Sequence, residues 1–246
     1  MKMNLKPAFC CQFPNILKGT AVFYLAIAVI SSVIMISSMS ISDQSTTTVS
    51  FSAYGFAAAV CLFVMGVTSI RSDLRLCLQF GVSRRTAFIS ELLSAACVSA
   101  VLAAAGELMT GASQLLTAGN PRYFTADLYQ LLFLGAHKMT LSFGQHIQSA
   151  MVNAGIMFAF CLAGMFFSLL FWRLNRPWTV VAAISIPLLI NGVPILVYKI
   201  GVDFRPFLSW LLSSPFCFVL FWLLLAGLLS VINWLLLRRA NIKAAK

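Results

Sequence analysis

The residues that could carry chemistry are few and are spread along the chain. Six carboxylates occur in 246 residues: Asp43, Asp73, Glu91, Glu107, Asp127 and Asp203. None of them forms a sequence pair suited to general acid–base catalysis. The two histidines, His137 and His146, are nine residues apart, which is not the i, i+4 spacing of helical metal ligands. We therefore predict no catalytic residue and no metal site, and expect both histidines to make polar contacts.

Motifs for hydrolysis and nucleotide binding are absent from the sequence. It contains no GxSxG, no HExxH and no P-loop GxxxxGK[ST]. The seven cysteines form no CxxC or Cys/His cluster, and most lie in apolar runs, where Cys packs as a small hydrophobe. The pair Cys10–Cys11 is either an acylation site near a membrane or two reduced thiols. We predict that the chain is not an enzyme and binds no cofactor itself.

The composition excludes a soluble globular protein. The chain is 61% hydrophobic and only 9% charged, whereas soluble domains contain about 25% charged residues. We therefore expect an all-α integral membrane protein that lies in a lipid bilayer. The net charge of +11 does not indicate a nucleic-acid partner, because excess Lys and Arg in such proteins usually lie in cytoplasmic loops.

Apolar runs long enough to cross a bilayer predict six transmembrane helices in a single domain, 1–246. Each is close to the roughly 20 residues that a span requires. The predicted spans are 21–41, 49–70, 87–106, 151–172, 178–198 and 216–237. The fifth is interrupted by Pro187 and Pro194, so its Gly/Pro region is either a hinge or path lining, or a simple helix irregularity.

The basic residues predict the orientation. With both termini cytoplasmic, thirteen of the seventeen Lys and Arg residues fall on the inside and four fall outside. This asymmetry favours a multi-pass protein whose termini both face the cytoplasm.

Two of the outside segments contain short apolar stretches. Residues 128–134, within the outside segment 107–150, are too few to span a bilayer. They predict either an interfacial or re-entrant helix or an extension of the fourth span. Residues 201–215 contain several aromatic residues and prolines and predict short half-helices at the membrane interface.

The loop between the second and third spans carries most of the information about function. Ser72 is suited to cap a short helix, and Gly81 is suited to end it. Ser83 is then expected to cap the third span. Glu91 is expected to pair with Arg84 or Arg85 at the interface, and its alternative is a role in transport. The short amphipathic helix is either an interfacial helix anchored by arginines or a helix that docks on a cytoplasmic partner.

Several sequence runs resemble those of ABC-2-type transporter permeases from bacteria. They are LCLQFGVSRR at 76–85, WRLNRPW at 172–178, IPLLINGVPIL at 186–196 and NWLLLRRANIK at 233–243. The resemblance implies a six-helix, type V exporter-like permease that forms a homo- or heterodimer in the bacterial plasma membrane. It also implies an amphipathic helix over 3–17, before the first span.

The resemblance further implies that a separate cytoplasmic P-loop ATPase binds ATP and Mg²⁺ and docks on a coupling helix. The docking residues would be Asp73, Leu74, Arg75, Leu78, Phe80, Gly81, Ser83, Arg84 and Arg85. The translocation path or hinge would include Pro187, Asn191, Gly192 and Pro194.

The expected function is therefore that of a permease subunit of an ATP-driven ABC transporter. By resemblance, the exported substrate would be a peptide or other amphiphile, as in antimicrobial-peptide export or self-protection. The alternative is a non-transporting accessory or immunity membrane protein that binds a peptide outside the cell.

Overall fold

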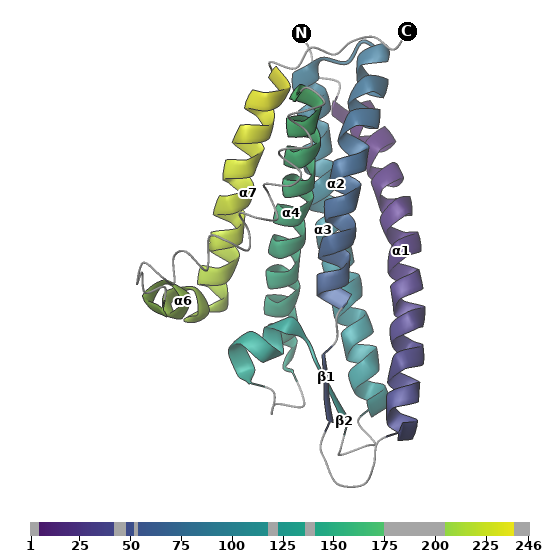
Figure 1. Cartoon of the computed structure of the whole chain (residues 1–246), viewed down its shortest axis with the longest axis vertical. Coiled ribbons are helices and arrows are strands. Elements are labelled where there is room, and N and C mark those ends of the chain that lie inside the picture. Colours follow the sequence, from purple (N-terminus) through teal and green to yellow (C-terminus); the bar gives the residue numbers. More distant parts are fainter. Residues whose placement is uncertain are drawn as a thin grey trace.

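The computed structural model describes residues 5–41, 48–51, 54–117, 123–135, 141–174 and 205–238. Its long helices are α1 (Leu5–Ile41), α2 (Tyr54–Gln79), α3 (Arg84–Thr117), α4 (Phe143–Arg173) and α7 (Pro215–Arg238). The short elements are the strands β1 (Thr48–Phe51) and β2 (Tyr123–Ala126), the π-helix η1 (Gln130–Leu134) and the helix α6 (Arg205–Leu212). The long helices run along one common direction (Figure 1).

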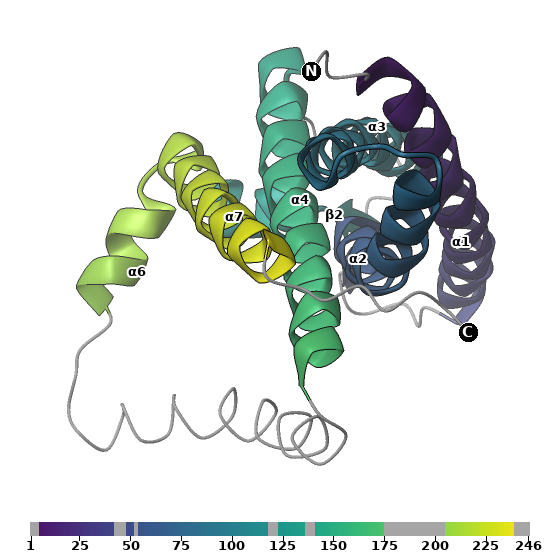
Figure 2. The same cartoon turned by 90° about the horizontal axis from the view of Figure 1, so that it is seen from above.

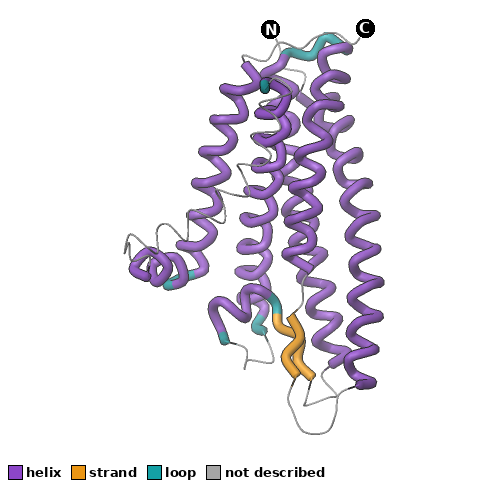
Figure 3. Tube along the Cα trace, viewed as in Figure 1, coloured by secondary structure: helices purple, strands orange, loops and turns teal. Residues whose placement is uncertain are grey.

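The two ends of this bundle differ in character. The beginning of α1, the turn between α2 and α3, and the ends of α4 and α7 lie together at what we call the turn end (Figure 1). The two strands lie at the opposite end, which we call the strand end, together with α6 and the beginning of α7 (Figure 3). Seen from above, α4 lies between α7 on one side and α1, α2 and α3 on the other (Figure 2).

Among the described residues, five helices are long and apolar enough to cross a membrane, namely α1 over Lys6–Ile30, α2, α3 over Arg84–Leu115, α4 and α7. This confirms the expectation of a largely helical protein with multi-pass character. The predicted fifth span, 178–198, lies outside the described residues. On either side of it, α4 ends at the turn end and α6 begins at the strand end (Figure 1).

The prediction of a separate amphipathic helix over 3–17 is wrong. Residues Leu5–Ile41 form one helix of 37 residues that contains Pro14. A proline removes one backbone hydrogen bond but need not end a helix that its neighbours support. Ala8 and Ile16 of this early part are buried in the same core as Ala58 of α2 and Ala95 of α3. Packing against the bundle therefore continues the helix through the proline.

The prediction of a separate short helix capped by Ser72 is also wrong. Helix α2 continues without a break to Gln79, and the Ser72 hydroxyl donates to the carbonyl of Ser69. No glycine or proline interrupts residues 67–80, and the buried residues Ile70, Leu74 and Cys77 extend the apolar face of α2. The segment therefore forms the last two turns of a spanning-length helix.

The end of α2 and the start of α3 follow the sequence prediction. Gly81 has φ of 73°, and the amides of Gly81 and Val82 donate to the carbonyls of Leu78 and Cys77 at 3.1 and 2.9 Å. These two bonds form a Schellman motif, which requires a left-handed residue and so favours glycine. Ser83 caps α3, because its Oγ accepts from the amide of Thr86 at 3.2 Å.

The strand pair was not predicted. β1 and β2 pair in parallel, with Thr48 opposite Tyr123 and Phe51 opposite Ala126. The chain then turns into a short helical segment, 128–134, which ends in η1. This confirms a short helix over 128–134, but it is separate from α4, so the alternative of an extended fourth span is wrong. α6 confirms a short helix within 201–215.

The closest helix contact joins α2 to α4. A Cβ on Gly66 would overlap the carbonyl oxygen of Cys161, and a Cβ on Gly164 would overlap that of Phe63. Two further bonds fasten the same contact: Ser168 Oγ donates to the Val67 carbonyl at 2.7 Å, and Arg71 Nη2 donates to the Ser168 carbonyl at 2.9 Å. Small residues permit this approach of two backbones.

We expect Gly164→Ala to lower the free energy of unfolding by about 1–3 kcal/mol, because the added methyl group must force α2 and α4 apart. Thermal unfolding in detergent measures the effect. The matched control is Gly227→Ala on α7, where an added Cβ meets nothing within 4 Å among the described residues. That change should leave stability equal or slightly higher. Equal losses at the two glycines would contradict the close contact.

Candidate functional site

The α2–α3 turn contains most of the predicted docking residues. Phe80 is 78% exposed at its tip. The other exposed docking residues are Arg75, Gly81, Ser83 and Arg85, while Leu78 and Arg84 are half-buried. Asp73 and Leu74 are buried, at 5% and 1% exposure. These two residues therefore cannot lie on a contact surface, which corrects their place in the predicted docking set.

Two arginines near this turn tie α2 to α4. The Arg75 guanidinium lies 5.9 Å from the centre of the Trp172 ring, a cation–π distance. One turn earlier, Arg71 donates to the carbonyl of Ser168. A displacement of the end of α2 would therefore be passed to the end of α4.

Directly beneath the turn lies a set of polar side chains, buried except for Asn15, which we call the inner polar layer. Its members come from α1, α2 and α3: Gln12, Asn15, Ser69, Asp73, Ser90 and Glu91. Ser69 Oγ donates to Glu91 Oε1 at 2.9 Å, and Asn15 Nδ2 donates to Asp73 Oδ1 at 3.4 Å. Ser90 Oγ donates to Gln12 Oε1. The layer thus joins three helices through side-chain hydrogen bonds.

The expectation that Glu91 pairs with Arg84 or Arg85 at the interface is wrong, because Glu91 lies inside the bundle. Glu91 is 1% exposed and accepts its hydrogen bond from Ser69 on α2. Within the described residues, Glu91 Oε2 and Asp73 Oδ2 have no hydrogen-bond partner. Buried carboxylates inside a membrane bundle are costly, so such positions usually serve a function.

A second polar set, which we call the outer polar cluster, lies near the strand end. It consists of Glu107 on α3, Asp127 directly after β2, and His146, Ser149 and Asn153 on α4. Ser149 Oγ lies within hydrogen-bond distance of Glu107 Oε1 and, at 2.8 Å, of Asp127 Oδ2, and its single hydrogen can be donated to either. Asn153 Nδ2 lies 3.3 Å from Glu107 Oε1 and 3.1 Å from Asp127 Oδ2. Both carboxylates therefore share the same two partners.

Residues around the outer polar cluster attach the segment after β2 to the bundle. Gln130 Oε1 accepts from the Asp127 amide at 2.9 Å and from Gln114 Nε2 at 3.0 Å. Tyr129 OH donates to Gln148 Oε1 at 2.6 Å. His146 Nδ1 lies 3.2 Å from Glu107 Oε2 at the edge of the cluster.

Sequence reasoning missed this cluster because it compared the acidic residues by their separation along the chain. Glu107 and Asp127 are far apart in sequence, yet β2 returns Asp127 to the side of α3. One signal was present: Ser149 and Asn153 are four residues apart on a largely apolar helix. That spacing puts both on one helix face. His146 does make a polar contact, as predicted, and His137 lies outside the described residues.

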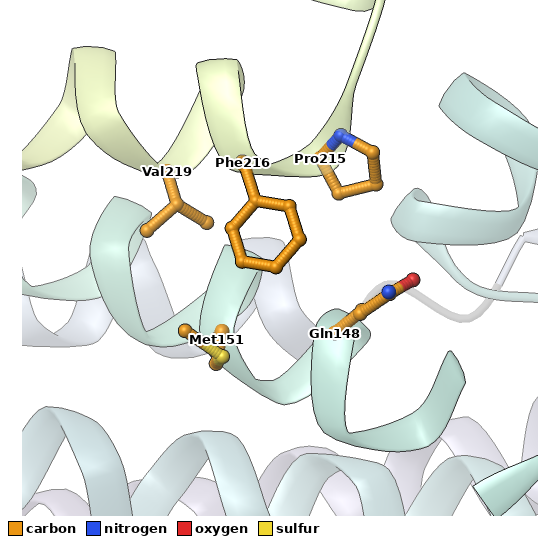
Figure 4. Close-up of a pocket in the computed structure, with 5 residues that line it drawn as sticks. All are labelled: Gln148, Met151, Pro215, Phe216 and Val219. Atoms are coloured by element: carbon orange, nitrogen blue, oxygen red, sulfur yellow. The ribbon is translucent and has the colours of Figure 1, made fainter. Parts of the chain in front are cut away.

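A shallow, open apolar depression adjoins this end of the bundle. Gln148 and Met151 on α4 face Pro215, Phe216 and Val219 on α7 across it (Figure 4). No charged residue lines this depression, so it is suited to bind an apolar group. The predicted path residues Pro187, Asn191, Gly192 and Pro194 lie outside the described residues.

Comparison of the chain with protein-family models, with curated proteins and with solved structures finds no match in any of the three. In the part of the chain that the structure describes, no group of three or more His, Cys, Asp and Glu side chains is placed to hold a metal ion.

We expect Ser69→Ala to cost about 1–3 kcal/mol of unfolding free energy, because Glu91 Oε1 would lose its donor while remaining buried. The control is the neighbour Thr68→Ala, whose exposed hydroxyl bonds only to carbonyls of its own helix. That change should stay within about 0.5 kcal/mol. Adding Glu91→Gln to Ser69→Ala should recover part of the loss. Equal effects at Ser69 and Thr68 in detergent unfolding would contradict the role of the bond.

Proposed function

We propose that this chain is the transmembrane permease subunit of an ATP-driven ABC transporter that exports a peptide or other amphiphile. The observation that carries the proposal is the α2–α3 turn, which presents an exposed aromatic side chain between two long antiparallel helices. In this proposal the turn end faces the bacterial cytoplasm, together with both termini. A separate P-loop ATPase supplies ATP and Mg²⁺, and a second permease copy or a paralogue completes the dimer.

The shape of the turn supports docking. Its backbone is fixed on one side by the Schellman motif and on the other by the Ser83 cap. Phe80 therefore projects from a rigid support, and its exposed ring could enter an apolar groove on the ATPase. Arg85, near the start of α3, is also exposed and favours a groove with an acidic rim.

The contacts behind the turn support force transmission. α2 and α3 are joined just below it by the bond between Ser69 and Glu91. α2 is joined to α4 through Arg75 and Trp172. A push on Phe80 would therefore move α2, α3 and α4 as one body, which is how rigid-body switching between inward- and outward-open states would begin.

A second candidate function is that of an accessory or immunity membrane protein that binds a peptide outside the cell. It is favoured by the exposed aromatic residues Phe207 and Trp210 on α6, at the strand end. The apolar depression between α4 and α7 lies near them. This function requires no ATPase and assigns no role to the exposed Phe80.

Purification from the native membrane distinguishes the two functions. We expect the chain to copurify with a P-loop ATPase, and Phe80→Ala to weaken that association about 30-fold, as for loss of an aromatic hot spot worth about 2 kcal/mol. Substrate-stimulated ATPase activity of the complex should fall in parallel.

The matched control is Phe143→Ala at the strand end, because Phe143 is 81% exposed and Phe80 is 78% exposed. This control should retain the ATPase. If neither the unaltered chain nor the control retains an ATPase while both remain folded, the permease proposal fails and the accessory function is favoured.

A further inference from the structure

We propose that the outer polar cluster binds one hard, oxygen-seeking cation, for which Ca²⁺ is the natural probe, and that this ion fastens β2 to α3 and α4. The inference is independent of the proposed transport function, since it concerns only the strand end of the molecule.

The first observation is the convergence of oxygen atoms. Ser149 Oγ lies within hydrogen-bond distance of Glu107 Oε1 and Asp127 Oδ2. Oxygens that share a Ca²⁺ ion lie at 2.3–2.6 Å from it, so neighbouring ligands are about 3 Å apart. The distance of 2.8 Å between Ser149 Oγ and Asp127 Oδ2 is already of this size. The two carboxylates also lie in one small volume, where a cation would relieve the repulsion between their ionised forms.

Asn153 can supply one more oxygen ligand of the kind found in calcium sites. Its side-chain amide lies 3.1–3.3 Å from one oxygen of each carboxylate. A half-turn of the amide would direct Oδ1 instead of Nδ2 toward the same position, and amide oxygens are regular Ca²⁺ ligands. The donor set is then two carboxylates, one hydroxyl and one amide, all of them oxygen, as Ca²⁺ prefers.

The second observation is a buried hydroxyl without a partner beside the cluster. Tyr24 of α1 is 6% exposed, and its OH has no hydrogen-bond partner among the described residues. The hydroxyl lies against Gly106, directly before Glu107 in α3. A buried hydroxyl rarely lacks a partner, whereas an ion or its bound water in the cluster would supply one.

The burial of the cluster sets the size of its ligand. Asp127 is 2% exposed and Ser149 is fully buried, so an amino or guanidinium group on a peptide could not reach between them. The side chains of His146 and Glu107 are 32% and 10% exposed, and they form the accessible edge. A single small ion could pass there. The absence of a group of three His, Cys, Asp or Glu ligands among the described residues disfavours zinc but not Ca²⁺, which accepts neutral oxygens.

The test is equilibrium dialysis of the purified full chain in detergent against radioactive Ca²⁺, alongside thermal unfolding over the same titration. We expect about one ion per chain, half-saturation in the range of about 10⁻⁴–10⁻³ M that is typical of extracellular sites, and a melting temperature that rises with Ca²⁺. EGTA should reverse the rise. Asp127→Asn should weaken binding about tenfold or more, because it removes one of two charged ligands.

The matched control is Glu91→Gln, which removes a buried carboxylate from the inner polar layer and should leave Ca²⁺ binding unchanged. Tyr24→Phe keeps the packing of the ring and should weaken binding less than Asp127→Asn does. If the unaltered chain binds no Ca²⁺ at millimolar concentration, or if Asp127→Asn binds it as well as Glu91→Gln does, the inference is overturned. Dialysis of the unaltered chain decides the first outcome even if a variant fails to fold.

Discussion

The close contact of α2 with α4 is the constraint on which the rest of the structure depends. At Gly66 and Gly164 each helix lies against the opposite backbone, with no room for a side chain. In lipid, where no hydrophobic force drives helices together, such close packing is a main source of association. α4 is thereby held in the middle of the bundle, and α7 packs on its other side (Figure 2). Asn233 of α7 donates to the Leu162 carbonyl across that second contact at 3.0 Å.

α4 also makes polar contacts near both of its ends. At the turn end, α4 contributes Trp172 and the Ser168 carbonyl to arginines of α2. At the strand end it contributes His146, Ser149 and Asn153 to carboxylates from α3 and from the segment after β2. Between these regions its buried side chains are apolar, including Met157, Leu162 and Met165. A movement at one end therefore reaches the other along a single packed helix.

The helices and their ends could be predicted from the sequence where local signals decide. Apolar length predicts the spanning helices, Gly81 predicts the end of α2, and Ser83 predicts the start of α3. Helix continuity at Ser72 and Pro14 could not be predicted in this way, because both residues carry local signals for an end that tertiary packing overrides. The outer polar cluster could not be predicted either, since it depends on β2 returning Asp127 to α3. Only the spacing of Ser149 and Asn153 hinted at a polar face inside the bundle.

The central claim is that the turn end, with its exposed Phe80, faces the cytoplasm, where an ATPase could reach it. Labelling of intact cells with a membrane-impermeant maleimide tests this most directly, using Phe80→Cys and Phe143→Cys in a chain whose exposed Cys10 and Cys11 are replaced by serine. The account predicts that the Phe143→Cys chain is labelled from outside and that the Phe80→Cys chain is labelled only after permeabilisation. Labelling of the Phe80→Cys chain in intact cells would contradict it.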